Sequence, residues 1–420
     1  MSEKIQIKDL DVIFGRRLKE AKKLVDQGFS KDDVLSKTGC TVAVNNANIN
    51  IREGEIFVVM GLSGSGKSTL LRCLNRLIEP TRGTVMLEDI DITKADSSKL
   101  RKLRREDMSM VFQHFGLLPH RTVASNVAFG LEINGYPEKE RLDRAYKVID
   151  TVGLKGYEEM MTGELSGGMQ QRVGLARALA NDPEIMLMDE AFSALDPLIR
   201  TNMQDELLAL QEKVKKTILF ITHDLDEALK LGDRIAIMKD GMIVQTGSPE
   251  DILTKPADDY VRSFVENVDR GKIVTAGTVM FNNPERIRLK TAGPAAAIRK
   301  MRSVGVTSLP VVDENNNFIG FVKDQDMANL QTEGVKSIEG KVYKDLNTVN
   351  ENVPIADLLP LFLDSAFNLA VVDDDNKLKG VIVHSSVIAE MIGKEKDEVK
   401  QIREEGLDNL TNEEGGNDNG

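Results

Sequence analysis

Short, uninterrupted apolar runs recur in the N-terminal part of the chain. Three of them are Ile56–Met60, 185–188 and 217–221. A run of this length, apolar on both faces, is typical of a strand buried inside a parallel sheet. The segment that follows the first run, 69–74, has helical character. The pattern predicts an α/β domain in which strands alternate with helices.

The segment 16–38 has the periodicity of short helices. Its apolar positions recur at helical spacing in Leu18, Ala21, Leu24 and Val25. Gly28 interrupts the periodicity, and Ser30 is suited to cap a second helix that opens with two aspartates. We therefore expect an insertion of two short helices.

An internal repeat occupies the C-terminal third of the chain. The segment 309–320 recurs as 369–380, at an offset of sixty residues without a gap. Each copy has two β-branched runs around a turn rich in Asp and Asn, which is the pattern of a hairpin. Helical segments precede the hairpins, at Pro294–Val304 and 354–365, so we expect an α+β unit that occurs twice. The remaining residues, 396–420, are acidic and polar, and we expect a disordered, solvating tail or a short helix that runs into one.

A glycine-rich loop follows the first apolar run and leads into a helix. It fits the pattern G-x-x-x-x-G-K-[ST], which ends in Lys67 and Ser68. Glycines let the backbone approach a phosphate closely, and the N-terminus of the helix adds a partial positive charge. We predict a nucleoside triphosphate site in which Lys67 reaches the β- and γ-phosphates and the Ser68 hydroxyl binds Mg²⁺. The candidate binding residues are Gly61, Ser63, Gly64, Ser65, Gly66, Lys67, Ser68 and Thr69.

The apolar run 185–188 ends in two carboxylates, Asp189 and Glu190. A carboxylate at the end of a strand can hold the water shell of Mg²⁺, and this is the predicted role of Asp189. Glu190 is placed to polarise the water that attacks the γ-phosphorus. Alone, such a pair fits a solvated loop equally well, but beside a phosphate loop it indicates a site of hydrolysis.

A second glycine-containing turn, Ser166-Gly167-Gly168, precedes a helix and provides a second anion-binding N-terminus. A domain that holds one nucleotide needs only one, so we expect this turn to cover the γ-phosphate of a nucleotide held by another copy. The sequence LSGGMQQR at this place resembles the signature of ATP-binding cassette (ABC) ATPases. The phosphate loop, the signature and the acidic strand follow that family's order, and the resemblance covers about residues 5–265.

The resemblance implies a P-loop ABC ATPase domain, with a mixed sheet core and a helical subdomain, in which two copies sandwich two ATP molecules. Gln113 matches the loop that joins the metal to a membrane partner, Asp196 the loop that crosses the dimer interface, and His223 the switch histidine at the γ-phosphate. Glu190 would be the general base, with Gln113 and His223 as the other catalytic residues. The family stacks adenine on an aromatic residue, for which Phe14 is the candidate, although a place in the hydrophobic core fits Phe14 nearly as well.

The insertion, the phosphate loop and the segment 188–198 are together similar to the quaternary-amine branch of the family, the ATPase subunits of glycine betaine and proline betaine importers. Ala191 fits this branch, since many other importers have proline there. The resemblance implies an integral-membrane permease partner, with or linked to a substrate-binding protein, and a peripheral place on the cytoplasmic face of the cell membrane. An importer of another small solute, such as an amino acid, is the alternative.

The repeated unit resembles a tandem pair of CBS modules, at about 275–335 and 338–395, after an ABC domain at 1–270. Such pairs have clefts that often take adenosine-containing ligands. Asp326 matches the usual ribose-binding aspartate, whereas the second copy has Ser386 there. Cyclic di-AMP is a natural candidate for a regulatory ligand. The alternative is that the CBS pair binds no ligand and has a purely structural role in dimerisation. Three further residues could line the cleft: Val279, Ile355 and Ala370.

The composition sets the surroundings of these sites. The net charge of −12 argues against nucleic acid as a partner. The chain has two cysteines and no apolar stretch of the ~18–20 residues needed to cross a bilayer. No signal peptide is apparent, so we expect a soluble protein of the cytosol. The basic residues within 99–105 predict a solvated helix face, with contact to anionic lipid as the alternative.

Two other classes of function remain. A non-transport ABC ATPase would act on DNA or ribosomes, but such proteins usually carry long coiled coils, zinc sites or two cassettes, and this sequence shows none of them. The chain could instead be a binding module in which the CBS pair determines the biology. Activity that persists after deletion of the residues beyond about 270 would exclude this second class.

Overall fold

The computed structural model describes residues 2–113, 116–266, 268–344, 346–363 and 367–391. The chain divides into two compact units, Met1–Val265 and Glu266–Gly420. The predicted tail at 396–420 lies outside the described residues.

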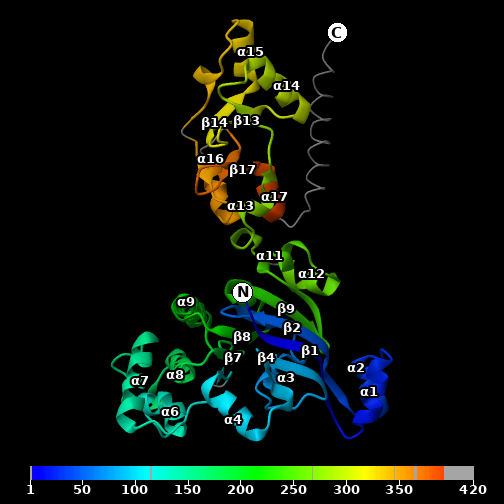
Figure 1. Ribbon diagram of the computed structural model, residues 1–420, viewed down its shortest axis with the longest axis vertical. Helices are drawn as coiled ribbons and strands as arrows, with labels where there is room; N and C mark the ends of the chain where they lie inside the picture. Colours follow the sequence, from blue (N-terminus) through cyan, green and yellow to red (C-terminus); the bar gives the residue numbers. More distant parts are fainter. Residues whose placement is uncertain (1, 114–115, 267, 345, 364–366, 392–420) are drawn as a thin grey trace, which may run out of the picture. The chain divides into compact units, whose positions relative to one another are not determined.

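The core of the first unit is a six-stranded sheet (Figure 1). Its strand order is β10-β9-β3-β8-β7-β6, and all neighbours are parallel except the hairpin of β9 and β10. The central strands are buried on both faces, which explains their continuous apolar runs. The strands are β3 (Ile56–Met60), β6 (Met108–Val111), β7 (Ile185–Asp189), β8 (Thr217–Thr222), β9 (Arg234–Lys239) and β10 (Met242–Gly247).

A second, antiparallel sheet has the order β2-β1-β4-β5. Its strands are β1 (Glu3–Phe14), β2 (Thr41–Arg52), β4 (Arg82–Leu87) and β5 (Ile90–Asp91). Helix α3 (Lys67–Leu74) shares one hydrophobic core with both sheets, in which Leu70 and Leu71 join Ile7 of β1 and Val59 of β3. The helix that follows the phosphate loop is therefore fixed by packing on two sides.

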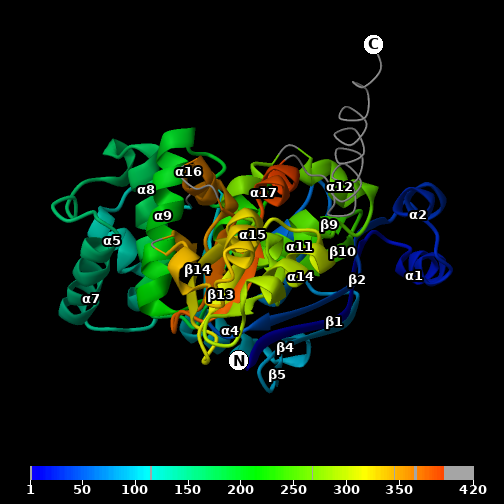
Figure 2. The ribbon, with the colours of Figure 1, turned by 90° about the horizontal axis from the view of Figure 1, so that it is seen from above.

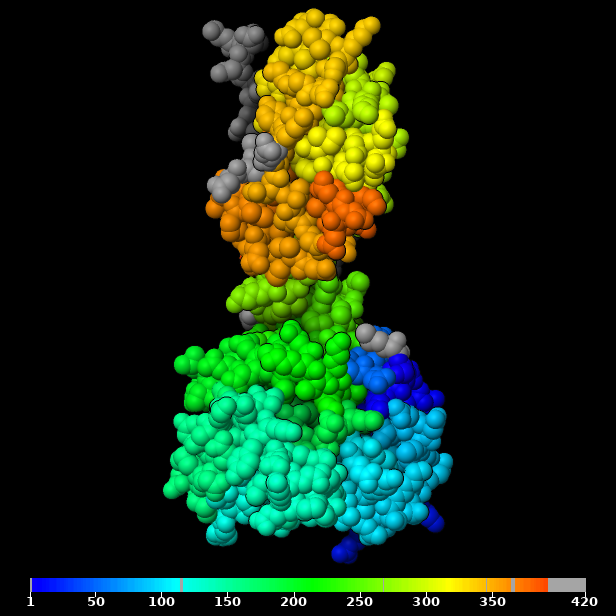
Figure 3. Space-filling model, turned by 60° about the vertical axis from the view of Figure 1, so that its left-hand side comes forward, coloured from blue at the N-terminus to red at the C-terminus, as the bar shows by residue number. Residues whose placement is uncertain are grey.

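Helices α5, α6, α7 and α8 form the helical subdomain at one side of the unit, and the insertion helices α1 and α2 lie at the opposite side (Figure 2). The segment around α4 lies beside this subdomain on one face (Figure 3), where the Asn134 amide donates to the Arg105 carbonyl. The helices are α1 (Leu18–Asp26), α2 (Lys31–Thr38), α4 (Ser97–Glu106), α5 (Val123–Val127), α6 (Phe129–Ile133), α7 (Glu138–Thr151), α8 (Gly167–Leu179), α9 (Pro197–Val214), α10 (Leu225–Leu231), α11 (Pro249–Thr254) and α12 (Asp259–Val265).

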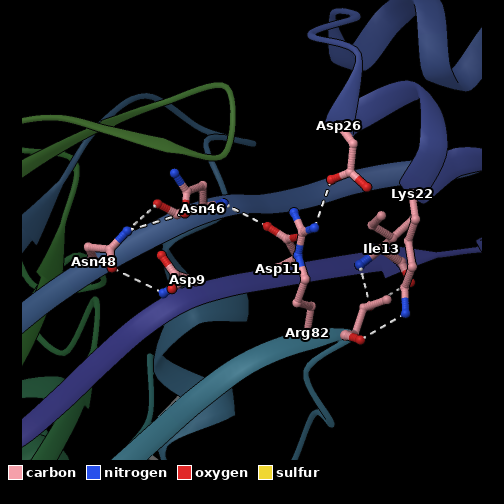
Figure 4. A network of polar contacts seen from close by, with 9 residues as sticks. Asp9, Asp11, Ile13, Lys22, Asp26, Asn46, Asn48 and Arg82 are labelled. Carbon is pink, nitrogen blue, oxygen red and sulfur yellow. Dashed lines mark hydrogen bonds and ion pairs between the residues drawn. The ribbon is translucent and has the colours of Figure 1, made fainter.

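Helix α2, the second helix of the insertion, begins at the cap that its sequence predicts. Ser30 caps α2 by accepting a hydrogen bond from the Asp33 N–H, and Gly39 closes the helix at φ 68°. Ion pairs attach α1 to the antiparallel sheet (Figure 4), where Arg82 of β4 lies between Asp11 of β1 and Asp26 of α1.

The second unit contains two related halves. Each half has a hairpin, β13 with β14 and β16 with β17, joined to a short parallel strand. The hairpin turns are related, since the Asn316 amide donates to the Leu378 carbonyl and the Asn376 amide to the Phe318 carbonyl, each at 3.1 Å. The strands are β11 (Phe281–Asn282), β12 (Ile287–Arg288), β13 (Ser308–Val312), β14 (Phe318–Lys323), β15 (Thr348–Val349), β16 (Leu369–Val372) and β17 (Leu378–Ile382).

The helices of the second unit are α13 (Ala276–Val279), α14 (Pro294–Val304), α15 (Asp324–Thr332), α16 (Leu359–Leu363) and α17 (His384–Met391). The expected single helix over 354–365 begins instead as a 3₁₀ turn, Ile355–Leu358, which continues into α16. Pro360 lacks the N–H that would bond to a carbonyl one turn earlier, which disfavours a regular α-helix through this point.

Candidate nucleotide site and switch residues

The phosphate loop is confined by backbone on two sides. Gly61 lies at φ 155°, and a Cβ atom there would overlap the carbonyl oxygen of Met238 in β9. Gly66 lies at φ 104°, and a Cβ atom there would overlap the carbonyl oxygen of Ala43 in β2. Only glycine fits both the conformation and the space. The loop therefore turns tightly from β3 into α3.

The side chain of Lys67 lies inside the curve of this loop. Its Nζ atom donates to the carbonyl oxygens of Gly61 (2.9 Å) and Leu62 (3.2 Å), and it lies 3.9 Å from Oε1 of Glu190. Burial lowers the pKa of Lys67, and the neighbouring carboxylates oppose this shift. A buried ammonium group held by two neutral carbonyls and a distant carboxylate is suited to attract a phosphate.

Two of the three residues predicted to hold Mg²⁺, Ser68 and Asp189, meet at the end of β7. The Ser68 hydroxyl donates to Oδ1 of Asp189 at 2.8 Å, and Arg72 lies 3.3 Å from Oδ2. Mg²⁺ in nucleotide sites takes one or two protein oxygens together with phosphate oxygens, so this pair fits the ion. Gln113 follows β6 and is exposed. The metal-binding roles of these residues stay predictions.

Glu190 and His223 meet because their strands are neighbours. In the parallel pair of β7 and β8, Asp189 lies opposite Ile221, so the residues after both strands project from the same edge of the sheet. Nδ1 of His223 lies 3.1 Å from Oε2 of Glu190. Glu190 itself adopts φ 45°, and its N–H donates to the Ile221 carbonyl. A non-glycine residue in this region is uncommon and often marks a functional site.

Arg200 connects the segment before α9 to the segment after β8. Its guanidinium donates to the Leu195 carbonyl at 3.1 Å and lies 3.4 Å from Oδ2 of Asp224, the residue after His223. Asp224 in turn caps α10 by accepting from the Glu227 N–H. The sequence does not single out Arg200, because nothing local indicates which distant loop its side chain joins.

The second glycine turn lies at the start of α8. Ser166 caps the helix by accepting from the Met169 N–H at 3.4 Å, and Ser166 and Gly167 are exposed. Gly168 is buried, and a Cβ atom there would lie 2.6 Å from Cγ2 of Ile199. Asp196, also exposed, caps α9. These residues are absent from the lining of the phosphate-loop cavity, and their predicted contact with another copy stays a prediction.

The cavity at the phosphate loop has a volume of about 370 Å³. Its lining includes residues 63–64 and 66–69, Glu190 and residues 41–43 of β2, together with a group from α2 that the sequence did not single out: Lys31, Asp32 and Leu35. Phe14 is 46% exposed, pairs with Thr41 at the end of β1 and is not among the lining residues. The i, i+4 spacing of Lys31 and Leu35 was visible in the sequence, but not the cavity they face.

The residues proposed for a CBS ligand occupy two kinds of environment. Val279, Ile355 and Ala370 are at most 1% exposed and belong to the interior of the second unit. Asp326 lies on α15, where it accepts a hydrogen bond from the Tyr343 hydroxyl at 2.9 Å. Their role toward a ligand stays a prediction.

The strand order and the loop between β3 and α3 define the first unit as a P-loop ATPase. Residues 44–193 match the family model of the ABC transporter, and residues 277–333 and 335–393 match that of the CBS domain. The solved structure of cbiO1 from Clostridium perfringens, part of the ABC transporter complex cbiONQ, is similar with a TM-score of 0.51 and 25% identity. That match covers 61% of this chain and 93% of that one.

Two relatives match the chain over nearly its whole length. The glycine betaine/carnitine transport ATP-binding protein GbuA of Listeria monocytogenes is 50% identical over 392 residues, which is 93% of this chain and 98% of GbuA. The glycine betaine transport ATP-binding protein OpuAA of Bacillus subtilis is 47% identical over 390 residues, or 93% of each chain. The chain therefore belongs to the ATP-binding subunits of ABC transporters, with a C-terminal pair of CBS domains, and couples ATP hydrolysis to transport. The predicted fold class and family are confirmed. Among the described residues, no helix has the length and apolar character required to cross a bilayer.

Proposed function

We propose that this chain is the ATP-hydrolysing subunit of an importer for glycine betaine or a related compatible solute. The observation that carries the proposal is the near-complete match to GbuA, which extends through both the ATPase and the CBS pair. The geometry supports the hydrolytic part, because Glu190 lies within hydrogen-bonding distance of His223 beside the phosphate loop. We expect a water molecule between Glu190 and the γ-phosphate to be the nucleophile.

In this proposal the ATP-hydrolysing subunit works as a homodimer. Each ATP lies between the phosphate loop of one copy and Ser166–Gly168 of the other, and Mg²⁺ is held by Ser68, Asp189 and Gln113. The exposure of Ser166, Gly167 and Asp196 supports this, since an interface residue must be accessible in the single chain. The dimer acts on a permease subunit, with or linked to a substrate-binding protein, at the cytoplasmic face of the membrane. Phe112 is 40% exposed next to Gln113 and offers an apolar contact to that permease.

The CBS pair is proposed to regulate the motor, with cyclic di-AMP as the candidate ligand. Its two related halves, with reciprocal hydrogen bonds between their turns, support a symmetric binding module. Salt is the second proposed signal, because screening shortens from about 10 Å at 0.1 M to about 3 Å at 1 M ionic strength. Helix α4 is the candidate contact to anionic lipid. Arg104 of α4 donates to the carbonyls of Asn75 and Arg76, and Lys102 pairs with Glu106 at 3.7 Å. The proposed lipid contact therefore rests on Lys99, Arg101 and Arg105.

The test is ATP hydrolysis by the chain reconstituted with its membrane partner, measured against salt with and without cyclic di-AMP. Activation by salt and suppression by the nucleotide would support an osmotically regulated importer. Indifference to both would leave the ATPase intact and make the CBS pair structural. Neutralising Lys99, Arg101 and Arg105 together should flatten the salt response in vesicles with anionic lipid. An unchanged response would exclude α4 as the sensor.

A further inference from the structure

The nucleotide cavity has a wall that the phosphate-binding residues do not provide. Lys31, Asp32 and Leu35 of α2 line the cavity together with the adjoining part of β2. The phosphate-loop side of the cavity carries the charged Lys67 and Glu190, whereas Leu35 of α2 adds an apolar side chain that is 47% exposed. A nucleoside triphosphate has one part with large apolar faces, which is its base.

Helix α2 has two distinct faces. Val34 and Thr38 are buried, and Val34 packs in a small cluster with Ile13 of β1 and Val42 of β2. Lys31 and Leu35, one turn apart on the helix, instead line the cavity. Leu35 is 47% exposed, so its side chain is available for a ligand rather than committed to the core.

One end of the insertion is tied to the antiparallel sheet (Figure 4). Arg82 donates to Asp11 at 2.6 Å and to Asp26, the last residue of α1, at 2.7 Å. Lys22 of α1 donates to the carbonyl oxygen of Thr81 at 3.0 Å. The Asp11 side chain is 1% exposed and the Arg82 side chain is 45% exposed, so this half-buried pair joins α1 to the antiparallel sheet.

The other end is tied to the hairpin beside the phosphate loop. Lys31 forms an ion pair with Asp240 in the turn between β9 and β10. The next residue, Gly241, donates its N–H to the Ser65 carbonyl of the loop at 3.0 Å. Helix α2 is therefore held against the same elements that shape the phosphate loop.

We propose that α2 is the base-binding wall of the nucleotide site and that Leu35 packs against the face of the purine. The insertion is thus a part of the ATP site and supplies the apolar contact that an aromatic side chain such as Phe14 would otherwise provide. Lys31 and its partner Asp240 set the position of α2 and need not touch the base.

The proposal separates binding of the base from binding of the phosphates. We would measure the affinities of the full-length protein for Mg·ATP and for inorganic tripolyphosphate, by competition with a fluorescent nucleotide and without turnover. Leu35→Asp should weaken ATP binding about tenfold, equivalent to about 1.4 kcal/mol, and change tripolyphosphate binding less than about twofold. Leu35→Tyr should tighten ATP binding, because an aromatic ring stacks on a base.

Leu18→Asp is the matched control, since Leu18 is a partly exposed leucine of α1 outside the cavity lining. It should leave both affinities unchanged. Unchanged ATP binding in Leu35→Asp would overturn the proposal, and so would an equal loss for ATP and tripolyphosphate. A loss of ATP affinity in Phe14→Ala that Leu35→Asp does not share would assign the base to Phe14 instead.

Discussion

Nδ1 of His223 lies 3.1 Å from Oε2 of Glu190, although 33 residues separate them in the chain. The contact exists because β7 and β8 are adjacent parallel strands that end at the same edge of the sheet. Lys67, at the start of α3, approaches Glu190 from the other side at 3.9 Å. A carboxylate, an imidazole and an ammonium group thus lie close together beside the phosphate loop.

We predict that Glu190→Gln binds Mg·ATP with nearly wild-type affinity and hydrolyses it about 10²–10⁴ times more slowly. Glutamine keeps the size and the hydrogen bond to His223 but cannot accept a proton from water. The measurement is a single-turnover rate of phosphate release beside the ATP affinity. Glu250→Gln, a change far along the chain on α11, is the control. Hydrolysis of ATP at the wild-type rate by Glu190→Gln would show that Glu190 is not the general base.

Arg200→Met should lower kcat about tenfold and leave the ATP affinity unchanged. The substitution removes the bridge between the Leu195 carbonyl and Asp224, so the backbone that carries His223 is less well positioned. Lys230→Met is the matched control. Lys230 also joins α10 to α9, through an ion pair with Asp205 at 2.7 Å. It lies further along the chain from His223 than Asp224 does. Equal effects of the two variants, or an effect of Arg200→Met on KM alone, would argue against a positioning role.

Arg82→Met should destabilise the first unit by about 1–2 kcal/mol, less than the loss for a fully buried ion pair, because the Arg82 side chain is 45% exposed. The Asp11 carboxylate loses the guanidinium but keeps its hydrogen bond from the Asn46 N–H. The measurement is thermal or urea unfolding, in which the transition of the first unit is recognised by its shift with ATP. Arg144→Met breaks an exposed pair with Glu140 and should cost about 0.5 kcal/mol or less. Equal losses in the two variants would contradict the account.

Glu227→Gln should be stabilising at neutral pH. Burial raises the pKa of Glu227 above its ordinary value of 4.5, and hydrogen bonds from Thr222 and Gln204 oppose the shift. Above pH 4.5 the unfolded chain therefore releases the proton while the folded chain still retains it, so stability falls as pH rises through the window between the two pKa values. Glutamine has no proton to lose and should remove this fall. Unfolding midpoints measured from pH 4 to 8 for both proteins would show it, and parallel pH profiles would contradict it.

The strands and the glycine loops could be predicted because their determinants are local. A strand buried on both faces shows a continuous apolar run, as β3, β7 and β8 do. A cap such as Ser30 and a repeat of sixty residues are likewise visible without knowledge of the fold.

The remaining part of the site depends on contacts between distant segments. Leu35 and Lys67 line one cavity because α2 is followed directly by β2, whose residues 41–43 line the same cavity beside the phosphate loop. Arg200 and Asp224 meet through the packing of α9 beside α10. No periodicity or motif in either segment specifies its partner, so these residues emerge from the structure alone.

The most direct test of the account is uptake of radiolabelled glycine betaine by proteoliposomes that contain this chain and its membrane partner. We expect ATP-dependent accumulation with the wild-type chain and none with Glu190→Gln. Competition by excess unlabelled amino acids should leave the uptake unchanged. ATP-dependent uptake of an amino acid, with no uptake of glycine betaine, would contradict the proposed solute. It would leave standing only the coupling of ATP hydrolysis to transport.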